Sequence, residues 1–501
     1  MRNKLRDLLK HSAVYSVGTI SERAVLILFL PLITAYLSPA EFGLVALMTL
    51  TTNLFTQLTL PIANTLNRFY YSPEMADERP VLLWNLFFLL CLKTLILFGI
   101  FVSFSGWISS LMDQSDSNVH DLLLVFSIVV LLQPIQGFIK TFFRLEQKAL
   151  YFVVVSFIQV LLYCIMLLLL LIVYDFGIYS IPIAIAVKTF WGILCFLPLF
   201  LRFMSYKFRL NLVKEPLKYG YSLILSGYSN YLLQSGDRAI LKMFCPLTLI
   251  GVYEVGYRIG STINFVIGIP VKQALQPIIF KQESQPEEQK SFLGKSATVY
   301  YGFSLLIGLA VSLFSRELVM LLSGQEAYHS AWVVVPFIVF SYIQQGLGNF
   351  LGLGMVMAKK AFFQSGIIVL AAFINIGLNF ILIPAIDIIG AAIATVSAYT
   401  AWSYLKAYYS WKFYKQGFEY KRLHLISLLW IIFVLTGVFV PVPSLLISLV
   451  FKSLLIVLFP LVVFFSGFLD PVEKGFVVKL AKMIWHVGIG KKRPKLFKKV
   501  P

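Results

Sequence analysis

The stretch from residue 151 to residue 174 reads YFVVVSFIQVLLYCIMLLLLLIVY, and none of its 24 residues carries a charge. An α-helix rises about 1.5 Å per residue, so about 20 apolar residues cross the roughly 30 Å hydrocarbon core of a bilayer. Residues 151–174 therefore predict a membrane-spanning helix.

Stretches of similar length and composition recur on both sides of this one, from Ser12 to Phe465. Over the whole chain 59% of residues are apolar and 13% are charged, against about 45–50% and about 25% in soluble domains. This composition excludes a soluble enzyme and a secreted disulfide scaffold. The sequence predicts an all-α polytopic membrane protein with about fourteen transmembrane helices, at residues 12–36, 42–66, 81–104, 121–139, 151–174, 177–201, 217–237, 250–276, 296–314, 331–357, 361–384, 388–408, 425–441 and 444–467.

The positions of the basic residues test both the number of helices and their direction. With the N-terminus placed inside, and with Lys218 and Lys406 near the inner ends of their spans counted as inside, 33 of the 42 lysines and arginines fall in inside segments, 3 in outside loops and 6 within spans. Cytoplasmic loops carry an excess of Lys and Arg, so this alternation predicts that both termini are cytoplasmic. The net charge of +19 then reflects membrane topology, and no nucleic-acid partner is expected.

The sequence also repeats itself at an offset of about 210 residues. Residues 39–43 (PAEFG) open the second predicted span, and residues 246–251 (PLTLIG) open the eighth. Six is an even number of spans, so duplicated halves enter the membrane in the same sense and enclose a cleft between them. The predicted units are an N-terminal lobe of helices 1–6 at residues 1–209, a C-terminal lobe of helices 7–12 at 210–416, and helices 13 and 14 with a basic cytoplasmic tail at 417–501.

Several motifs carry a resemblance to a known family. Residues 235–241 (SGDRAIL), followed by 250–253 (IGVY) and 256–258 (GYR), look like the central signature of the polysaccharide transporter family. Residues 36–43 (YLSPAEFG) and 323–328 (SGQEAY) are similar to the same family. These proteins are Wzx-type O-antigen, capsule and exopolysaccharide flippases of the MATE-like multidrug/oligosaccharidyl-lipid/polysaccharide exporter superfamily (MOP superfamily).

The resemblance implies a function, a compartment and partners. It implies a flippase that moves a polyprenyl-diphosphate-linked oligosaccharide from the cytoplasmic to the outer leaflet by alternating access, for lipopolysaccharide or other surface polysaccharide biosynthesis. It implies a multi-pass protein of the bacterial cytoplasmic (inner) membrane, surrounded by membrane lipids, with a glycan polymerase and chain-length machinery as possible partners. No cofactor is expected, and coupling to H⁺ or Na⁺ stays open.

An anionic diphosphate requires fixed cations in the cleft. A charged side chain inside a membrane has a high free-energy cost, so each one is a candidate for a functional role. Polar residues concentrate on spans 1, 2, 7 and 8, which are equivalent pairs under the repeat. In the resembling lipid II flippases, arginines on the first and eighth helices line a cationic cavity, and Arg23 and Arg258 match that placement. The predicted substrate-binding cations are Arg23, Arg258, Lys272, Lys93 and Lys188. The predicted polar lining and gating residues are Glu22, Asn53, Asn230, Asp237, Arg238 and Glu254.

Structural interpretations of these residues remain open. Arg258 could be neutralised by Glu254 one helical turn away, and Arg23 could pair with an acid of another helix. Asp237 and Arg238 could be a helix-end pair instead of a gate. Lys93 and Lys188 could serve the cleft or only the packing, and Lys272 could extend to the inner surface.

Two other functions compete with flipping. A MATE-like multidrug or cation antiporter would favour twelve helices and an acidic lobe. A membrane glycan polymerase or ligase would carry a large outer loop with catalytic Arg and His residues, and here no outer loop exceeds about twenty residues. No Walker A motif, catalytic triad or metal-ligand cluster occurs in the sequence. A membrane transporter is expected, and not an enzyme.

Overall fold

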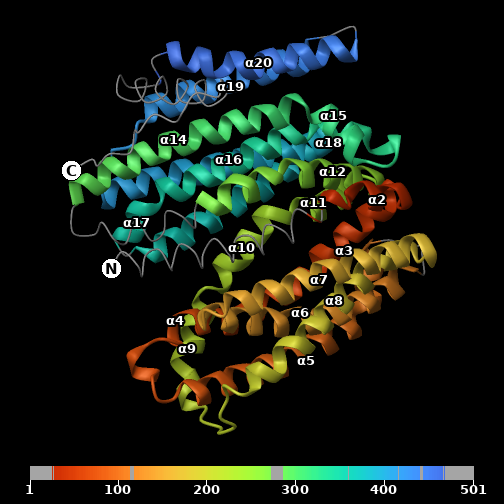
Figure 1. Cartoon of the computed structure of the whole chain (residues 1–501), viewed down its shortest axis with the longest axis vertical. Helices are drawn as coiled ribbons and strands as arrows, with labels where there is room; N and C mark the ends of the chain where they lie inside the picture. Colours follow the sequence, from red (N-terminus) through yellow and green to blue (C-terminus); the bar gives the residue numbers. More distant parts are fainter. Residues whose placement is uncertain are drawn as a thin grey trace, which may run out of the picture.

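The computed structural model describes residues 25, 27–112, 118–271, 286–358, 360–415, 417–440, 444–466 and 468. Within these residues the chain consists of helices joined by short connections, and no strand occurs among them. The all-α fold predicted from the sequence is confirmed (Figure 1).

The first part of the chain forms the helices α2 (Leu30–Tyr36), α3 (Pro39–Gln57), α4 (Leu60–Phe69), η1 (Pro73–Met75), α5 (Arg79–Met112), α6 (Asn118–Leu145), α7 (Ala149–Leu168), η2 (Leu169–Val173), η3 (Gly177–Tyr179) and α8 (Ser180–Leu201). The rest forms α9 (Asn211–Ser222), α10 (Ile224–Ser235), α11 (Asp237–Phe244), α12 (Leu247–Gly260), η4 (Asn264–Gly268), α14 (Pro286–Leu313), α15 (Ser315–Leu322), η5 (Glu326–Val333), α16 (Val335–Leu351), α17 (Leu353–Met357), α18 (Ala361–Phe413), α19 (Tyr420–Phe439) and α20 (Leu445–Phe465).

Eight of the described helices are long and apolar enough to cross a membrane, and there are ten candidates if each of two bent helix pairs counts as one span. The chain is therefore a multi-pass membrane protein, and the number fourteen stays a prediction. Part of the difference lies in α18, which covers the predicted spans 361–384 and 388–408. Its backbone leaves the helical region at Ile386 and Asp387, and Asp387 has a φ of 48°. Two helices thus meet at that point.

Breaks also divide two other predicted spans. The predicted span 42–66 is divided at Leu58 and Thr59, just before Pro61 in the first turn of α4. Proline has no backbone N–H to donate to the preceding helical turn, so Pro61 explains why the helix breaks at this point. The predicted span 217–237 is divided at Leu223 and again at Gly236. Each of these spans is consequently a chain of short helices that can change direction.

Two groups of helices are visible in Figure 1, and the broken spans connect them. The helices α4 to α8 share an apolar core rich in phenylalanine, and Val213 of α9 belongs to the same core. The helices α10 to α20 form the other group, with α2 and α3 packed on it beside α12. The first part of the seventh predicted span, in α9, therefore packs with the first half of the chain, while α10 and α11 pack on α18.

The helices α19 and α20 lie at the edge of the second group, beside α14 (Figure 1). One ion pair fixes α20 to α15: the Lys452 ammonium donates to Glu317 Oε1 at 2.6 Å. The Lys452 side chain is only 9% exposed and that of Glu317 is 20% exposed. The lysine in the last predicted span is accordingly a packing residue that binds its helix pair to the rest.

Candidate functional site

The two halves of the chain meet where α3 and α12 begin. The α3 terminus is fixed by a capping box, in which the Ser38 backbone N–H donates to Glu41 Oε2 at 2.7 Å and the Glu41 N–H to Ser38 Oγ at 3.4 Å. A Cβ on Gly43 would collide with the Leu247 carbonyl oxygen, and a Cβ on Gly251 would collide with that of Pro39. Glycine at both positions therefore permits direct backbone contact between the helices.

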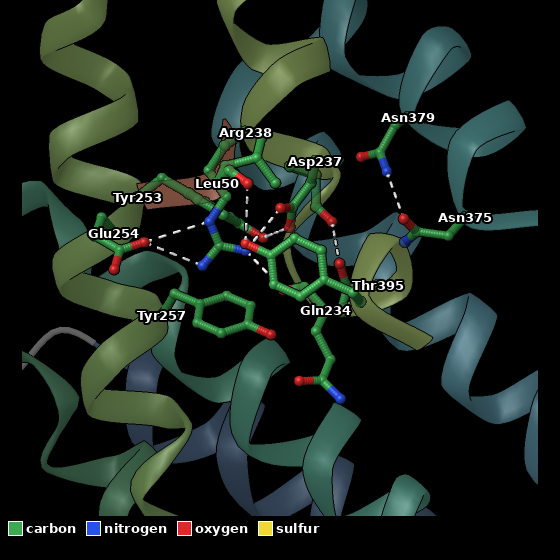
Figure 2. Close-up of polar contacts among 12 residues, drawn as sticks. Leu50, Gln234, Asp237, Arg238, Tyr253, Glu254, Tyr257, Asn375, Asn379 and Thr395 are labelled. Atoms are coloured by element: carbon green, nitrogen blue, oxygen red, sulfur yellow. Dashed lines mark hydrogen bonds and ion pairs between the residues drawn. The ribbon is translucent and has the colours of Figure 1, made fainter. Parts of the chain in front are cut away.

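Four of the predicted site residues form one network at this joint, on α11 and α12. The Glu254 carboxylate accepts from Arg238 Nη2 at 3.1 Å through Oε2 and from Arg258 Nε at 2.8 Å through Oε1. Arg238 Nη1 also donates to Asp237 Oδ1 at 2.7 Å. Figure 2 shows the Arg238 guanidinium between the two carboxylates. Two arginines are thus balanced by two acids.

The surroundings of Arg238 are those of a buried structural residue. Its side chain is 6% exposed, and Nη1 donates to the Gln234 carbonyl oxygen at 2.8 Å. Its guanidinium lies 3.9 Å from the ring centre of Tyr257 and 5.3 Å from that of Tyr253. The Tyr253 hydroxyl donates to Asp237 Oδ2. Burial, hydrogen bonds and aromatic rings together hold this cation in place.

Arg258 is placed differently, although it shares Glu254. Its side chain is 25% exposed, and its guanidinium lies 4.7 Å from the ring centre of Phe42 on α3. Its hydrogen bond to Glu254 uses Nε, and its two terminal nitrogens have no hydrogen-bond partner among the described residues. Arg258 therefore lies at the contact between the halves with donors available for a ligand. The pairing with Glu254 that the i,i+4 spacing indicated is present.

The other predicted residues lie elsewhere or outside the described part of the chain. Lys93 on α5 donates to the Tyr221 hydroxyl of α9 at 3.0 Å, and Lys188 on α8 lies 4.5 Å from the Tyr163 ring centre. Asn53 lies on α3 close to Leu50, whose carbonyl oxygen accepts from the Tyr231 hydroxyl of α10 at 3.4 Å, and Asn230 precedes that tyrosine. The residues Arg23, Glu22 and Lys272 lie outside the described residues.

Two buried asparagines that we did not predict lie near this network. Asn379 Nδ2 donates to Asn375 Oδ1 at 3.0 Å, and both side chains are almost fully buried. Figure 2 draws them near Asp237, together with Thr395 of the second part of α18. Their spacing of four residues inside an apolar span was a usable signal, because polar side chains in a membrane need partners. Among the described residues no group of three or more His, Cys, Asp or Glu side chains could hold a metal ion.

Comparison with known proteins agrees with this arrangement of helices. The sequence model of a family described as polysaccharide biosynthesis protein matches residues 8–284. The probable low-salt glycan biosynthesis flippase Agl15 of Haloferax volcanii is 23% identical over 202 residues, which are 40% of this chain and 42% of that relative. The match thus spans less than half of the length of that relative.

Solved structures share the fold at low sequence identity. A structure of the lipid II flippase MurJ in an inward closed conformation matches with a TM-score of 0.72 at 15% identity, over 91% of this chain and 99% of that one. A bent form of the Vibrio cholerae MATE transporter VcmN matches with a TM-score of 0.57 at 16% identity, over 81% and 98% of the two chains. The relatives that match are flippases and transporters.

Proposed function

The chain belongs to the polysaccharide biosynthesis protein family, and on that premise we propose that it is a flippase for a polyprenyl-diphosphate-linked oligosaccharide. It moves this cargo from the cytoplasmic to the outer leaflet of a bacterial inner membrane, for O-antigen, capsule or exopolysaccharide assembly. A glycan polymerase and its chain-length machinery then receive the product. The flippase activity in the names of Agl15 and MurJ supports this proposal.

The position of Arg258 is the observation that carries the proposal. The residue lies at the contact between the halves, keeps a quarter of its side chain exposed and uses Nε for Glu254. A planar guanidinium binds phosphate oxygens through two parallel hydrogen bonds, which suits a diphosphate better than an ammonium does. Arg238 is fully engaged and buried, so it holds Glu254 in position and does not bind the cargo.

Alternating access then requires that contacts between the halves open at one end at a time. Contacts exist at both ends of the helices. At one end α3 meets α12 through Gly43 and Gly251, and at the other α4 meets α9, where Gly220 lies against the Pro61 carbonyl group. The breaks beside α4 and α9 supply the bends that such a movement needs. The two six-helix lobes remain part of this proposal.

A reconstituted transport assay tests the function. The full chain is placed in liposomes with a fluorescent undecaprenyl-diphosphate-linked sugar, and a membrane-impermeant quencher reports how much label reaches the outer leaflet. The flippase proposal expects faster quenching with the chain than without it. Arg258→Gln should abolish the gain, while Arg202→Gln, at an exposed arginine that follows α8, should retain it.

A drug extruder of the same fold is the competing function, supported by the structural likeness to VcmN. It predicts no acceleration of the lipid-linked sugar and a saturable efflux of ethidium from the same liposomes. If ethidium efflux is present and depends on Arg258 while sugar transfer is absent, the extruder replaces the flippase.

A further inference from the structure

A second pocket lies where α15 meets the helix pair α19 and α20, apart from the joint between α3 and α12. Its volume is about 450 Å³, and residues from the end of α14, from α15 and from the facing ends of α19 and α20 line it. Small-molecule sites occupy roughly 300–1,000 Å³, so the pocket has room for one small polar group. Its charged lining residues are Arg316, Glu317 and Lys452, and the proposed function gives none of them a role.

The Glu317 carboxylate in this pocket is only half satisfied. Its Oε1 accepts from the Lys452 ammonium at 2.6 Å, whereas its Oε2 is buried and has no hydrogen-bond partner in the part of the chain that the structure describes. Buried polar atoms are nearly always paired, and a carboxylate oxygen only accepts, so Oε2 points to a ligand with an N–H or O–H donor. The side chain is 20% exposed, and the broad terminal torsion of a glutamate lets Oε2 turn toward the pocket.

Arg316, the preceding residue, supplies a positive charge to the same pocket. Its side chain is exposed, and it makes no ion pair or hydrogen bond with another residue of the described ranges. Adjacent residues of a helix do not face each other, so the Arg316 guanidinium and the Glu317 carboxylate do not neutralise one another. The pocket therefore offers an anion-binding group and a hydrogen-bond acceptor of opposite charge, which suits a ligand that carries both charges.

The remaining lining connects the pocket to the membrane. Met320, Val440 and Leu445 line it and are 42%, 45% and 67% exposed, although all three are apolar. Large apolar side chains exposed on the helices of a membrane protein face lipid. Trp332 also lines the pocket, and tryptophan is enriched at the depth of the lipid headgroups. The occupant therefore has a charged end in the pocket and an apolar part in the bilayer.

We propose that this pocket binds the headgroup of phosphatidylethanolamine, with the phosphate at Arg316 and the ammonium donating to Glu317 Oε2. A guanidinium binds two phosphate oxygens at once, and a primary ammonium has three N–H donors. Glu317 then lies between two ammonium groups, that of the lipid and that of Lys452. Lys452 is a positioning residue, because it holds the carboxylate and leaves Oε2 to the lipid.

The bound lipid links two parts of the chain. Arg316 and Glu317 belong to α15, whereas Leu445 and Lys452 belong to α20, so a headgroup between them strengthens the contact of α20 with α15. The orientation predicted from the basic residues puts this pocket at the outer leaflet. No cargo takes part in the binding, so the proposal does not depend on the flippase function.

Binding is measured by the melting temperature of the purified full chain in maltoside detergent while a short-chain lipid is added. Dihexanoyl phosphatidylethanolamine should cause a saturable rise. Dihexanoyl phosphatidylcholine has the same charges but no N–H donor on its ammonium, and dihexanoyl phosphatidylglycerol has hydroxyl donors but no positive charge. Each should therefore bind about tenfold more weakly. Since the three lipids share their acyl chains, only the headgroup accounts for a difference.

Arg316→Gln tests the phosphate contact. The residue is exposed, so the melting temperature of the lipid-free variant should be unchanged, while binding of phosphatidylethanolamine weakens about tenfold. Arg202→Gln, at an exposed arginine that follows α8, is the matched control and should bind like the unchanged chain.

The ammonium contact is tested with both members of the ion pair replaced, because Glu317→Gln alone leaves the largely buried Lys452 without its acid. Apolar residues of similar volume often replace a buried ion pair without loss of stability, so Glu317→Leu combined with Lys452→Met should fold. This double variant should bind phosphatidylethanolamine and phosphatidylcholine equally, because Arg316 still holds the phosphate of both.

Three results would overturn the proposal. These are the absence of a saturable rise with phosphatidylethanolamine, an equal rise with phosphatidylcholine in the unchanged chain, and normal binding by Arg316→Gln. A stronger effect of phosphatidylglycerol would replace the assigned headgroup by an anionic one. Phosphoethanolamine without acyl chains should bind more weakly than the lipid, because it leaves the apolar side of the pocket empty. Equal binding of the two would overturn the assignment to a lipid.

Discussion

Arg238 and Arg258 bind the two oxygens of a single carboxylate, that of Glu254, at 3.1 and 2.8 Å. The Glu254 side chain is 13% exposed, so it is no solvated partner of a surface arginine. In the sequence, Glu254 and Arg258 are an i,i+4 pair on one helix. An exposed pair of this kind contributes little to the stability of the chain. The second arginine changes that expectation, because the loss of this carboxylate removes the ion pair of Arg258 and leaves the buried Arg238 with Asp237 alone.

Glu254→Gln should destabilise the chain by about 3–5 kcal/mol, the range found when one partner of a buried ion pair is removed. A lower melting temperature in detergent and reduced accumulation in the membrane would show it. Glu326→Gln, at an exposed acid, is the matched control. Normal melting of Glu254→Gln would mean that the network is hydrated and weak.

Lysine in place of each arginine should separate the two roles. Arg258→Lys keeps the charge but loses the planar fork, so the chain should accumulate normally while transport of the lipid-linked sugar falls at least tenfold. Arg238→Lys cannot reach Asp237 and Glu254 together, so accumulation itself should fall. Membrane abundance and quencher-detected transport measured on the same preparations decide between these outcomes. Equal behaviour of the two variants would contradict the division of roles.

The glycine contact should tolerate no larger residue. Gly43→Ala and Gly251→Ala place a methyl group against backbone carbonyl groups of the other helix, so each should lower the melting temperature. Gly106→Ala is the control, because a Cβ there meets nothing within 4 Å. Unchanged melting of both variants would show that α3 and α12 are apart in the membrane.

The ion pair between Lys452 and Glu317 should hold α20 in place. Lys452→Gln alone leaves a largely buried carboxylate and should lower the melting temperature, whereas Lys452→Gln combined with Glu317→Gln should recover part of the loss. A double-mutant cycle on the unfolding free energy measures the coupling. Additive effects of the two substitutions would exclude a direct interaction.

Topology can be tested with introduced cysteines in a chain whose four native cysteines are replaced by alanine. A cysteine at Ser110, exposed at the end of α5, should react with an impermeant reagent in intact cells. A cysteine at Asp77, in the exposed connection before α5, should react only after permeabilisation. The reverse pattern would invert the orientation derived from the basic residues.

The sequence was sufficient for features that repeat along one helix. Apolar length predicted the helical membrane fold, and the spacing of Glu254 and Arg258 made their contact one of the interpretations left open, which the structure contains. The sequence did not predict which helices contact one another. Arg238 reaches Glu254 from 16 residues away because the chain turns between α11 and α12, at Cys245 and Pro246. Hydrophobic periodicity identifies the face that a helix turns inward, but does not identify the neighbour that this face meets.

The same limit applies to a cavity of about 290 Å³ that residues of α6, α7 and α8 line, among them Gln159 and Lys188. Lys188 was a candidate because a lysine inside a span is unusual, and Gln159 was passed over because a lone glutamine is not. Their proximity depends on how α7 and α8 pack, and on Gly192, which no sequence pattern connects to either residue. Neither the cavity nor the Gln159 Oε1 atom, which has no hydrogen-bond partner in the described part of the chain, was therefore predictable.

Gly43 and Gly251 occupy corresponding positions of the repeat predicted from the sequence, and each meets the backbone of the other's helix. A duplicated gene can ordinarily let one copy of a residue drift while the other keeps its function. Here that freedom is absent, because enlarging either residue pushes the same two helices apart. Both copies are held by a single steric constraint, and a substitution in one half cannot be compensated by keeping glycine in the other.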